Sequence, residues 1–453
     1  EAQDALGFHK SKVVVNELIR AILKAKVDLL FNGGIGTYVK ASSEHNMNVG
    51  DRTNDSLRIN GEELRAKVVA EGGNLGFTQL GRVEYALNGG KLNTDAIDNS
   101  GGVNCSDFEV NIKILLNGVV AAGDLTEKQR NVLLSEMTDE VAELVLENNR
   151  SQIEAISVAE YNAPKNAQMH CRLIDHLEQN ANLDRALEFL PTNEELLTRQ
   201  QSGKGLTRPE FSVLLAYCKT LLKGELLASD VPEDKYIAMD LVTAFPEVLR
   251  ERYEKEMFSH RLKREIIAMQ ISNAVVNDMG LGFIHRLQDE TGASVPDIIR
   301  GYIAAREIFR ARRFREAVNA LDFIVPAEIQ TKMLHELNRL VRRGTRWFLR
   351  HRIGSLSVEE VIKHFTPKMQ LVKEGLHHAL SGSSEEYLLE FAKELMAENV
   401  PEETALVTAQ MGAMFSALDI VDAAITHNLP VENVTITYYA VGARLELGWF
   451  REQ

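Results

Sequence analysis

The stretch Val68–Glu109 constrains the fold of this chain more than any other part of the sequence. Two short apolar runs, Lys67–Ala70 and Lys91–Asp95, each pass into a loop rich in Gly, Asn and Ser. In α/β folds, ligand crevices form where strands end in such loops and lead into helices. Glycine lets backbone N–H groups approach a ligand, and asparagine offers a donor and an acceptor without charge. The stretch therefore predicts two strands of a sheet with a ligand site at their carboxyl ends.

A further short apolar run lies upstream at Val27–Phe31 and predicts a buried strand. The glycine-rich segment Asn32–Gly36 is then the loop after this strand. Gly34–Val39 is close to the G-x-G-x-x-G fingerprint of dinucleotide-binding folds, but Val39 replaces the third glycine, so the match is weak. From spacing alone, a tight turn after a buried strand is an equally good interpretation. Ser11–Lys24, before this strand, has the apolar periodicity of a helix.

Three segments of the chain resemble motifs of one known family. Glu71–Thr78, with the sequence EGGNLGFT, resembles the EGAN-x-P-x-T segment of amino-acid dehydrogenases of the glutamate dehydrogenase family. Asp98–Glu109 resembles that family's N-A-G-G-V-x-x-S-x-F-E segment, and Asp28–Gly36 looks like the strand and loop just before. The three matches follow the family's order and cover about the first quarter of the chain. With the long helical continuation, they look most like the large NAD-specific glutamate dehydrogenases.

The resemblance implies a cofactor site in the loops. Asn74 and Asn99 would lie beside the nicotinamide end of NAD, and the backbone of Gly33 and Gly34 would line the cofactor. An amide side chain can hold a carboxamide or a ribose hydroxyl by paired hydrogen bonds.

The resemblance also implies two substrate-binding residues. In the family's G-G-V-x-x-S segment the serine lies by the side-chain carboxylate of the substrate and the valine lines the same pocket, and the matching residues are Ser106 and Val103. A hydroxyl at a helix start, beside free N–H groups, suits a carboxylate. Without the resemblance, an ordinary turn is the better interpretation, with Asn99 in a left-handed conformation and Ser106 capping the next helix.

The first motif departs from the family at two positions. Gly73 stands where the family has Ala, and Gly76 stands where it has Pro. Glu71, at the start of the same loop, could be taken for a general base. A structural role, in which its carboxylate accepts backbone N–H bonds within the loop, is the better interpretation.

The activity implied by the resemblance is the NAD-dependent conversion of L-glutamate to 2-oxoglutarate and ammonia. The catalytic Lys and Asp, the substrate-carboxylate lysines and the phosphate loop come earlier in the family's order, and none has a match here. We therefore assign no catalytic residue, expect the chain to be the C-terminal part of a longer polypeptide, and expect it to be inactive alone. The alternative is a non-catalytic helical module for regulation or oligomerisation that carries part of a nucleotide-binding fold.

Beyond residue 122 the chain becomes helical in character. All ten prolines lie beyond residue 163, and the region has helical apolar periodicity. Capping boxes are expected at Thr126, Thr192, Thr207, Ser357 and Ser383. The predicted fold class is α/β followed by all-α. Residues 1–122 would form the C-terminal part of a Rossmann-like parallel-sheet domain, and residues 123–453 a large helical domain whose best candidate breaks lie near 203 and 230.

The charge and the cysteine content of the chain exclude several classes of partner and site. A net charge of −14 argues against nucleic acid as a partner, and no apolar run approaches a membrane span. The three cysteines make no metal-spacing motif and suggest a reducing compartment, so we expect a cytoplasmic protein without a metal site. The size of the helical region predicts a homo-oligomer. Gly203-Lys204-Gly205 lacks the remaining P-loop residues and predicts no phosphate site.

Overall fold

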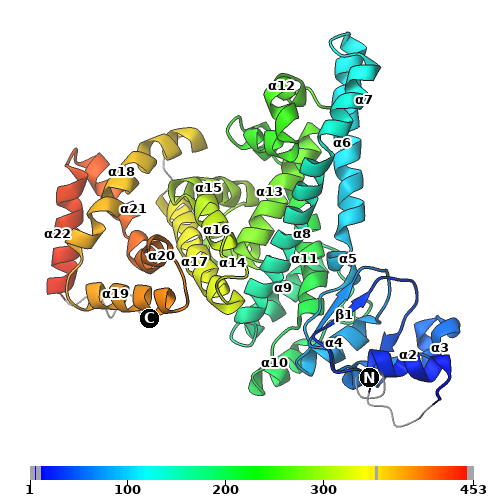
Figure 1. The fold of residues 1–453 in the computed structure, drawn as a ribbon. Coiled ribbons are helices and arrows are strands. Elements are labelled where there is room, and N and C mark those ends of the chain that lie inside the picture. The colour runs from blue at the N-terminus through cyan, green and yellow to red at the C-terminus, as the bar shows by residue number, and fades with distance from the viewer. Residues whose placement is uncertain (1–5, 7–11, 352–355, 446–453) are drawn as a thin grey trace. The chain divides into compact units, whose positions relative to one another are not determined.

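The structure is a computed structural model that describes residue 6, residues 12–351 and residues 356–445. Most of these residues are helical, and the strands form two small parallel sheets of two strands each (Figure 1). The prediction of a mostly helical chain with strands near its beginning is confirmed. Two compact units result: Glu1–Ala228 with Ala238–Gly282, and Ser229–Ile237 with Phe283–Gln453. The domain boundary at residue 122 stays a prediction.

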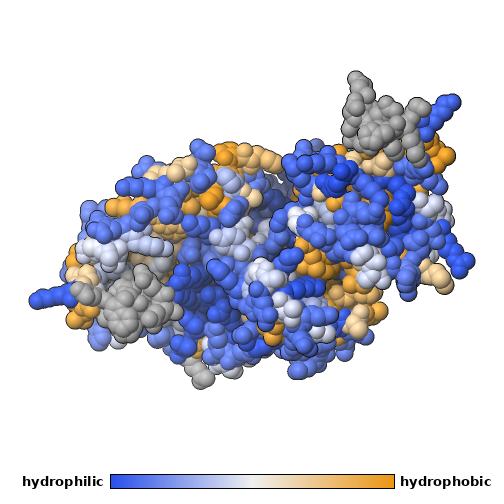
Figure 2. All heavy atoms as spheres, turned by 90° about the horizontal axis from the view of Figure 1, so that it is seen from below, coloured by the Kyte–Doolittle hydropathy of each residue, from blue (hydrophilic) through white to orange (hydrophobic). Residues whose placement is uncertain are grey.

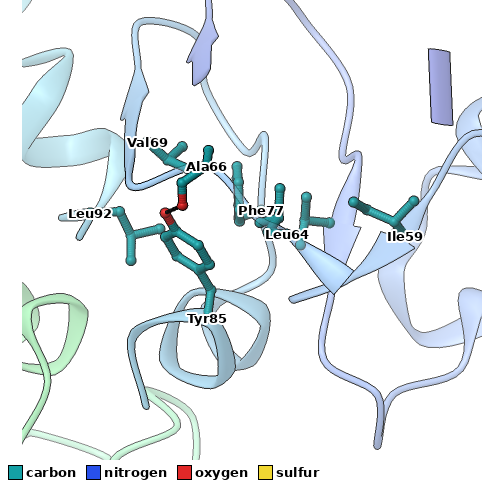
Figure 3. Packing of buried hydrophobic residues seen from close by; sticks show 8 residues of the cluster. Ile59, Leu64, Ala66, Val69, Phe77, Tyr85 and Leu92 are labelled. Carbon is teal, nitrogen blue, oxygen red and sulfur yellow. Dashed lines mark hydrogen bonds between the residues drawn. The ribbon is translucent and has the colours of Figure 1, made fainter. Parts of the chain in front are cut away.

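The sheets of the first unit surround a small apolar core. Strand β1 (Leu29–Asn32) pairs with β4 (Val68–Glu71), and β2 (Val39–Lys40) pairs with β3 (Ile59–Asn60). Between them lies a cluster that Figure 3 shows: Val39, Ile59, Leu64, Ala66, Val69, Phe77, Tyr85 and Leu92. The hydroxyl of Tyr85 donates to the carbonyl oxygen of Ala66 at 2.7 Å, so the one polar atom of this ring is satisfied inside the core.

Two strand predictions need correction. The strand at Val27–Phe31 exists as β1, but it is not buried: Leu29 is 56% and Phe31 is 64% exposed, because β4 is its only strand partner among the described residues. The strand predicted at Lys91–Asp95 is reduced to one bridge between Lys91 and Val68. The chain turns away there because Asp95 already begins a helix.

The polar composition of Ser42–Glu62 predicts an irregular surface loop, but in the structure this segment is ordered around a buried arginine. It contains α3 (Asn46–Val49), η1 (Arg52–Asn54) and β3, and η2 (Gly61–Glu63) begins within it. The guanidinium of Arg58 is buried and donates to the carbonyl oxygen of Thr37 at 2.9 Å and to the carboxylate of Asp55. Sequence reasoning missed this centre because charged residues in a polar segment are usually solvated.

Helix α8 is the longest helix of the first unit and packs on several others. Helices α6, α11 and α13 all lie against it (Figure 1). The helices are α2 (Val15–Leu23), α4 (Gln79–Leu87), α5 (Asp95–Asp98), α6 (Ser100–Ala122), α7 (Glu127–Glu136), α8 (Thr138–Tyr161), α9 (Ala167–Asn180), α10 (Asn193–Gln201), α11 (Arg208–Leu227), α12 (Glu247–Met257) and α13 (Lys263–Met279), with η4 (Ile237–Ala244) beginning at the unit boundary.

The second unit is built from helices around α15 (Val295–Ile308), which packs on both α17 (Ala327–His351) and α18 (Val358–Ala379). Its other helices are η3 (Val231–Glu233), α14 (Phe283–Thr291), α16 (Ala311–Asn319), α19 (Ser383–Ala397), α20 (Glu402–Met414), α21 (Ala417–Thr426) and α22 (Val431–Arg444). At the end of the chain, Val434–Tyr439 has the composition of a strand, but Tyr438, Val441, Leu445 and Trp449 have helical spacing, which favours a helix. Helix α22 confirms this prediction as far as Arg444, and Trp449 lies outside the described residues.

Helix starts follow the local chemistry of the sequence. The capping boxes at Thr126, Thr192, Thr207 and Ser357 are all formed. The box at Ser383 is wrong, because α19 starts at that residue with Gly382 in the capping position.

Figure 2 shows a face of the molecule that is mostly hydrophilic, as the high content of charged residues leads one to expect. Among the described residues, no single helix has both the length and the apolar composition to cross a membrane. The pair α20 and α21 meets that test only when taken together, across a bend of 60°.

The first testable consequence of this fold concerns His170 in α9. The ring is buried against Phe211, and burial lowers its pKa from 6.5 to about 4. The pKa of His170 is depressed only in the folded state, so the unfolded chain binds a proton at this ring at a higher pH than the folded chain does. The stability that the neutral ring contributes is therefore fully present above pH 6.5 and is lost as the pH falls toward 4. Lowering the pH from 7 to 5 should therefore reduce the unfolding free energy of the chain by about 2 kcal/mol through this group.

In His170→Leu this part of the pH dependence should disappear, as measured by urea unfolding at pH 7 and pH 5. Leu173→Val, at another buried position of α9, alters packing without a titratable group and should keep the pH dependence. An equal loss of stability in His170→Leu and in the unaltered chain would show that His170 does not titrate as described.

Candidate functional site

The candidate site lies where β1 and β4 end. In the register of this parallel pair Asn32 stands opposite Glu71, so the two glycine loops leave the same edge of the sheet. The loops touch: the N–H of Gly73 donates to the carbonyl oxygen of Asn32 at 3.0 Å. The sequence pattern placed glycine loops after both of these strands, but it did not predict that the two loops touch.

The close approach of the loops explains both departures from the family motif. A Cβ atom on Gly73 would lie 2.2 Å from the carbonyl oxygen of Gly34, and one on Gly76 would lie 1.8 Å from Nδ2 of Asn32. The contact at Gly73 is with the backbone, so glycine is required there in this arrangement, whereas a Cβ atom on Gly76 would require the side-chain amide of Asn32 to move. By contrast, a Cβ atom on Gly34 would meet nothing within 4 Å, and Gly33 and Gly34 are exposed at the surface of the loop.

Asn74 and Asn99 are brought together by a direct hydrogen bond. Nδ2 of Asn99 donates to Oδ1 of Asn74 at 2.9 Å, and both side chains are exposed. This bond uses one donor and one acceptor. Within the described residues, Nδ2 of Asn74 and Oδ1 of Asn99 have no other partner, so the pair presents a donor and an acceptor side by side to a ligand.

Val103 and Ser106 lie on the exposed side of α6, whose capping residue is Asn99. They are three residues apart and therefore share one face of the helix, and Val103 is 71% exposed. The expectation that Ser106 lies at a helix start is wrong, because α6 already begins at Ser100. Its hydroxyl donates instead to the carbonyl oxygen of Gly102 at 3.3 Å, one turn earlier.

Glu71 has a structural role, with an arginine as its partner in place of the expected backbone N–H groups. Its side chain is 0% exposed, and Arg82 donates to both of its carboxylate oxygens at 2.6 and 3.1 Å. Burial raises the pKa of Glu71, and the bonds and charge of Arg82 oppose that rise. A carboxylate with both oxygens held and no access to solvent is not a general base for a bound substrate.

Two further carboxylates hold the loop that carries Asn74. Asp98 accepts the backbone N–H of Glu71 at 3.0 Å, and Asp95 accepts that of Leu75 at 2.7 Å. Asp95 also contacts Arg82 at 3.2 Å. Leu75 has a positive φ of 59°, a strained conformation for a branched side chain that its bond to Asp95 helps to hold. Sequence reasoning assigned no role to either carboxylate, although Asp98 begins the second motif and Asp95 lies three residues before it.

The site thus combines backbone groups, two amides, a hydroxyl and an apolar side chain. All six residues predicted for it are exposed: Gly33, Gly34, Asn74, Asn99, Val103 and Ser106. None of them carries a titratable side chain, so these loops can bind and orient a ligand without supplying an acid or a base. No cluster suited to a metal ion occurs among the described residues.

The glycine contacts give a second prediction. Gly73→Ala forces the two loops apart and should lower the unfolding free energy by about 1–3 kcal/mol, as overpacking does. Gly34→Ala is the matched control, because the space beside it is open, and it should change stability by less than about 0.5 kcal/mol. Both values come from urea unfolding, and equal stabilities of the two variants would contradict the close approach.

Comparison with known proteins identifies the family of the chain. The model "Glutamate dehydrogenase, C-terminal" matches residues 203–453, and the model "Bacterial NAD-glutamate dehydrogenase, catalytic domain" matches residues 1–159. The NAD-specific glutamate dehydrogenases of Halomonas elongata and Pseudomonas aeruginosa are 49% and 48% identical over the whole chain, and the chain spans 28% of each. That of Mycobacterium tuberculosis is 40% identical over 428 residues, which is 94% of the chain and 26% of that protein. Because the first model covers more than half of the chain, the chain belongs to the glutamate dehydrogenase family.

Proposed function

We propose that the protein containing this chain oxidatively deaminates L-glutamate to 2-oxoglutarate and ammonia, with hydride transfer to NAD. The observation that carries the proposal is the Asn74–Asn99 pair, in which Asn74 follows β4 and Asn99 directly precedes the helix that bears Val103 and Ser106. In this proposal the chain forms one wall of the active site. The acid–base residues come from the remainder of a polypeptide of which this chain spans about 28%, as in its relatives.

The proposed domain is the last part of a Rossmann-like sheet at residues 1–122, followed by a helical domain at 123–453. Its support is the parallel pairing of β1 with β4 and the bridge that adds Lys91 on the far side of β4. Parallel strands joined by crossovers, with loops at their carboxyl ends, are the arrangement that binds dinucleotides in open α/β sheets.

The residues of the loops fit a nicotinamide cofactor. The free donor of Asn74 and the free acceptor of Asn99 match the two functions of a carboxamide, and they match ribose hydroxyls equally well. Gly33 and Gly34 would let the loop backbone approach the cofactor, because no side chain shields it. When bound, NAD supplies the hydride acceptor. The chain's own residues contribute orientation and leave the redox chemistry to the cofactor.

Val103 and Ser106 are the proposed substrate-binding residues. The Ser106 hydroxyl bonds only weakly to Gly102 at 3.3 Å and can turn to donate to a carboxylate. Val103 offers an apolar surface one turn earlier, suited to the methylene groups of glutamate. A hydrogen bond to a charged group contributes about 1.5–3 kcal/mol, which sets the size of the expected effect.

We further propose a cytoplasmic homo-oligomer. The free state of all three cysteines, of which Cys105 is exposed, supports a reducing compartment. The self-assembly proposal rests on the size of the helical region. Removing residues 151–453 from the complete protein should lower its oligomeric state as measured by light scattering, and an unchanged state would contradict the proposal.

The substrate assignment is tested by Ser106→Ala in the complete protein. The KM for L-glutamate should rise by about tenfold or more, while the KM for NAD stays the same, because only the carboxylate contact is lost. Ser135→Ala, at an exposed position of α7, is the matched control and should behave like the unaltered enzyme. Absence of glutamate-dependent NAD reduction in the unaltered protein would refute the proposed activity, whereas unchanged kinetics in Ser106→Ala would refute only the substrate site.

A further inference from the structure

Residues 203–209, which lead into and begin α11, dock on α4, the helix that follows the loop carrying Asn74. Nζ of Lys204 donates to the carbonyl oxygen of Leu87 at the end of α4, and Nε2 of Gln79 in α4 donates to that of Pro209, at 2.9 and 3.2 Å. A Cβ atom on Gly205 would lie 2.6 Å from the backbone of Ala163, so this glycine allows a close approach. Gly203-Lys204-Gly205, which is no P-loop, therefore brings the start of the region matched by the C-terminal family model against α4 and the residues just after α8.

Arg208 is the buried end of this segment. It is 8% exposed, and its Nη1 donates to Oγ of Ser157 at 3.0 Å and to Oε2 of Glu160 at 3.1 Å, both in α8. Glu160 also pairs with Lys91 at 2.8 Å, so it is shared between two cations. The Nε of Arg208 points to a different partner, Oδ1 of Asn93, at 3.1 Å. The guanidinium thus joins α8 to the segment that follows the sheet.

Asn93 connects Arg208 to Asp98, the residue next to Asn99 of the candidate site. It is buried, and its Nδ2 donates to Oδ1 of Asp98 at 2.9 Å while its oxygen accepts from Arg208. Only one orientation of the amide is possible. A flipped amide would turn its NH₂ group toward the guanidinium and its oxygen toward the carboxylate, which are both repulsive contacts.

Asp98 ends this chain of hydrogen bonds at the site itself. Its second oxygen accepts the backbone N–H of Glu71, and the next residue is Asn99, which holds Asn74. Buried hydrogen-bond networks fix a geometry only when every member is satisfied. Loss of the donor on Asn93 leaves Asp98 with one fewer bond in a partly buried place, and its carboxylate can then rotate away from Glu71.

We propose that Arg208 is a positioning residue that, through Asn93 and Asp98, sets the geometry of the Asn74–Asn99 pair and so governs the affinity for the nicotinamide cofactor. The inference rests on the proposed function for the identity of the ligand. It gives the start of the C-terminal helical region a role in cofactor binding, although Arg208 itself touches neither Asn74 nor Asn99.

Two variants of the complete protein test the proposal from opposite ends. Arg208→Lys keeps a cation for Glu160 but cannot bond to Ser157, Glu160 and Asn93 in the forked geometry of arginine. Asn93→Asp keeps the acceptor for Arg208 and removes the donor to Asp98. Each should raise the KM for NAD by about tenfold and leave kcat nearly unchanged. The double variant should be no worse than Asn93→Asp alone, because both changes break the same chain of bonds.

Hydrogen exchange without any ligand gives a readout that does not depend on activity. Backbone amides of residues 71–75 should exchange faster in both variants. Lys204→Met, which removes another docking contact of the same segment, should leave both the exchange and the KM for NAD unchanged. Thermal unfolding of each variant confirms that the comparison is between folded proteins.

The outcomes separate the two proposals. Faster exchange at residues 71–75 in a protein that does not reduce NAD would uphold the positioning role and refute the proposed function. Unchanged exchange in both variants, additive effects in the double variant, or an equal effect of Lys204→Met would overturn the role of Arg208.

Discussion

The ion pair between Glu71 and Arg82 is the interaction on which the candidate site depends. Two buried charges are stable together only when hydrogen bonds satisfy both of them, and removing one partner leaves an uncompensated charge. Here Arg82 satisfies both oxygens of Glu71 and also contacts Asp95. Asp95 in turn binds the backbone of Leu75. The pair therefore determines where the strand ends, where the loop turns and where Asn74 can lie.

Features that depend on neighbouring residues could be predicted from the sequence, whereas buried charges that pair with distant residues could not. The glycine loops after β1 and β4 and the capping box at Ser357 depend on neighbours a few residues apart, and these predictions hold. The burial of Arg82 and Arg208 could not be predicted, because Arg82 bonds to Glu71, 11 residues away in the sequence, and Arg208 bonds to Asn93, 115 residues away. A sequence pattern treats such residues as solvated, since burial of a charge depends on a partner that only the fold supplies.

The start of α6 likewise could not be predicted from neighbouring residues alone. Gly101 and Gly102 each disfavour a helix by about 1 kcal/mol, so this segment reads as a loop. The structure offsets that cost with Asn149 of α8, whose Nδ2 donates to the carbonyl oxygen of Ile97 at 2.7 Å and to Oγ of Ser100 at 2.9 Å. The turn before α6 is thereby held by a residue that no local pattern connects to it.

Gly102 also bears on the proposed substrate site. A Cβ atom there would meet nothing within 4 Å, so packing within the chain does not require glycine. The residue lies one turn before Ser106 on the exposed side of α6, where a substrate in the proposed position would pass. The side chains of Leu29, Phe31 and Val68 likewise form an exposed apolar face on the sheet. A two-stranded sheet with an open apolar face is only marginally stable by itself. Both features fit the proposed function, in which substrate and the remaining polypeptide would lie against surfaces that this chain leaves open.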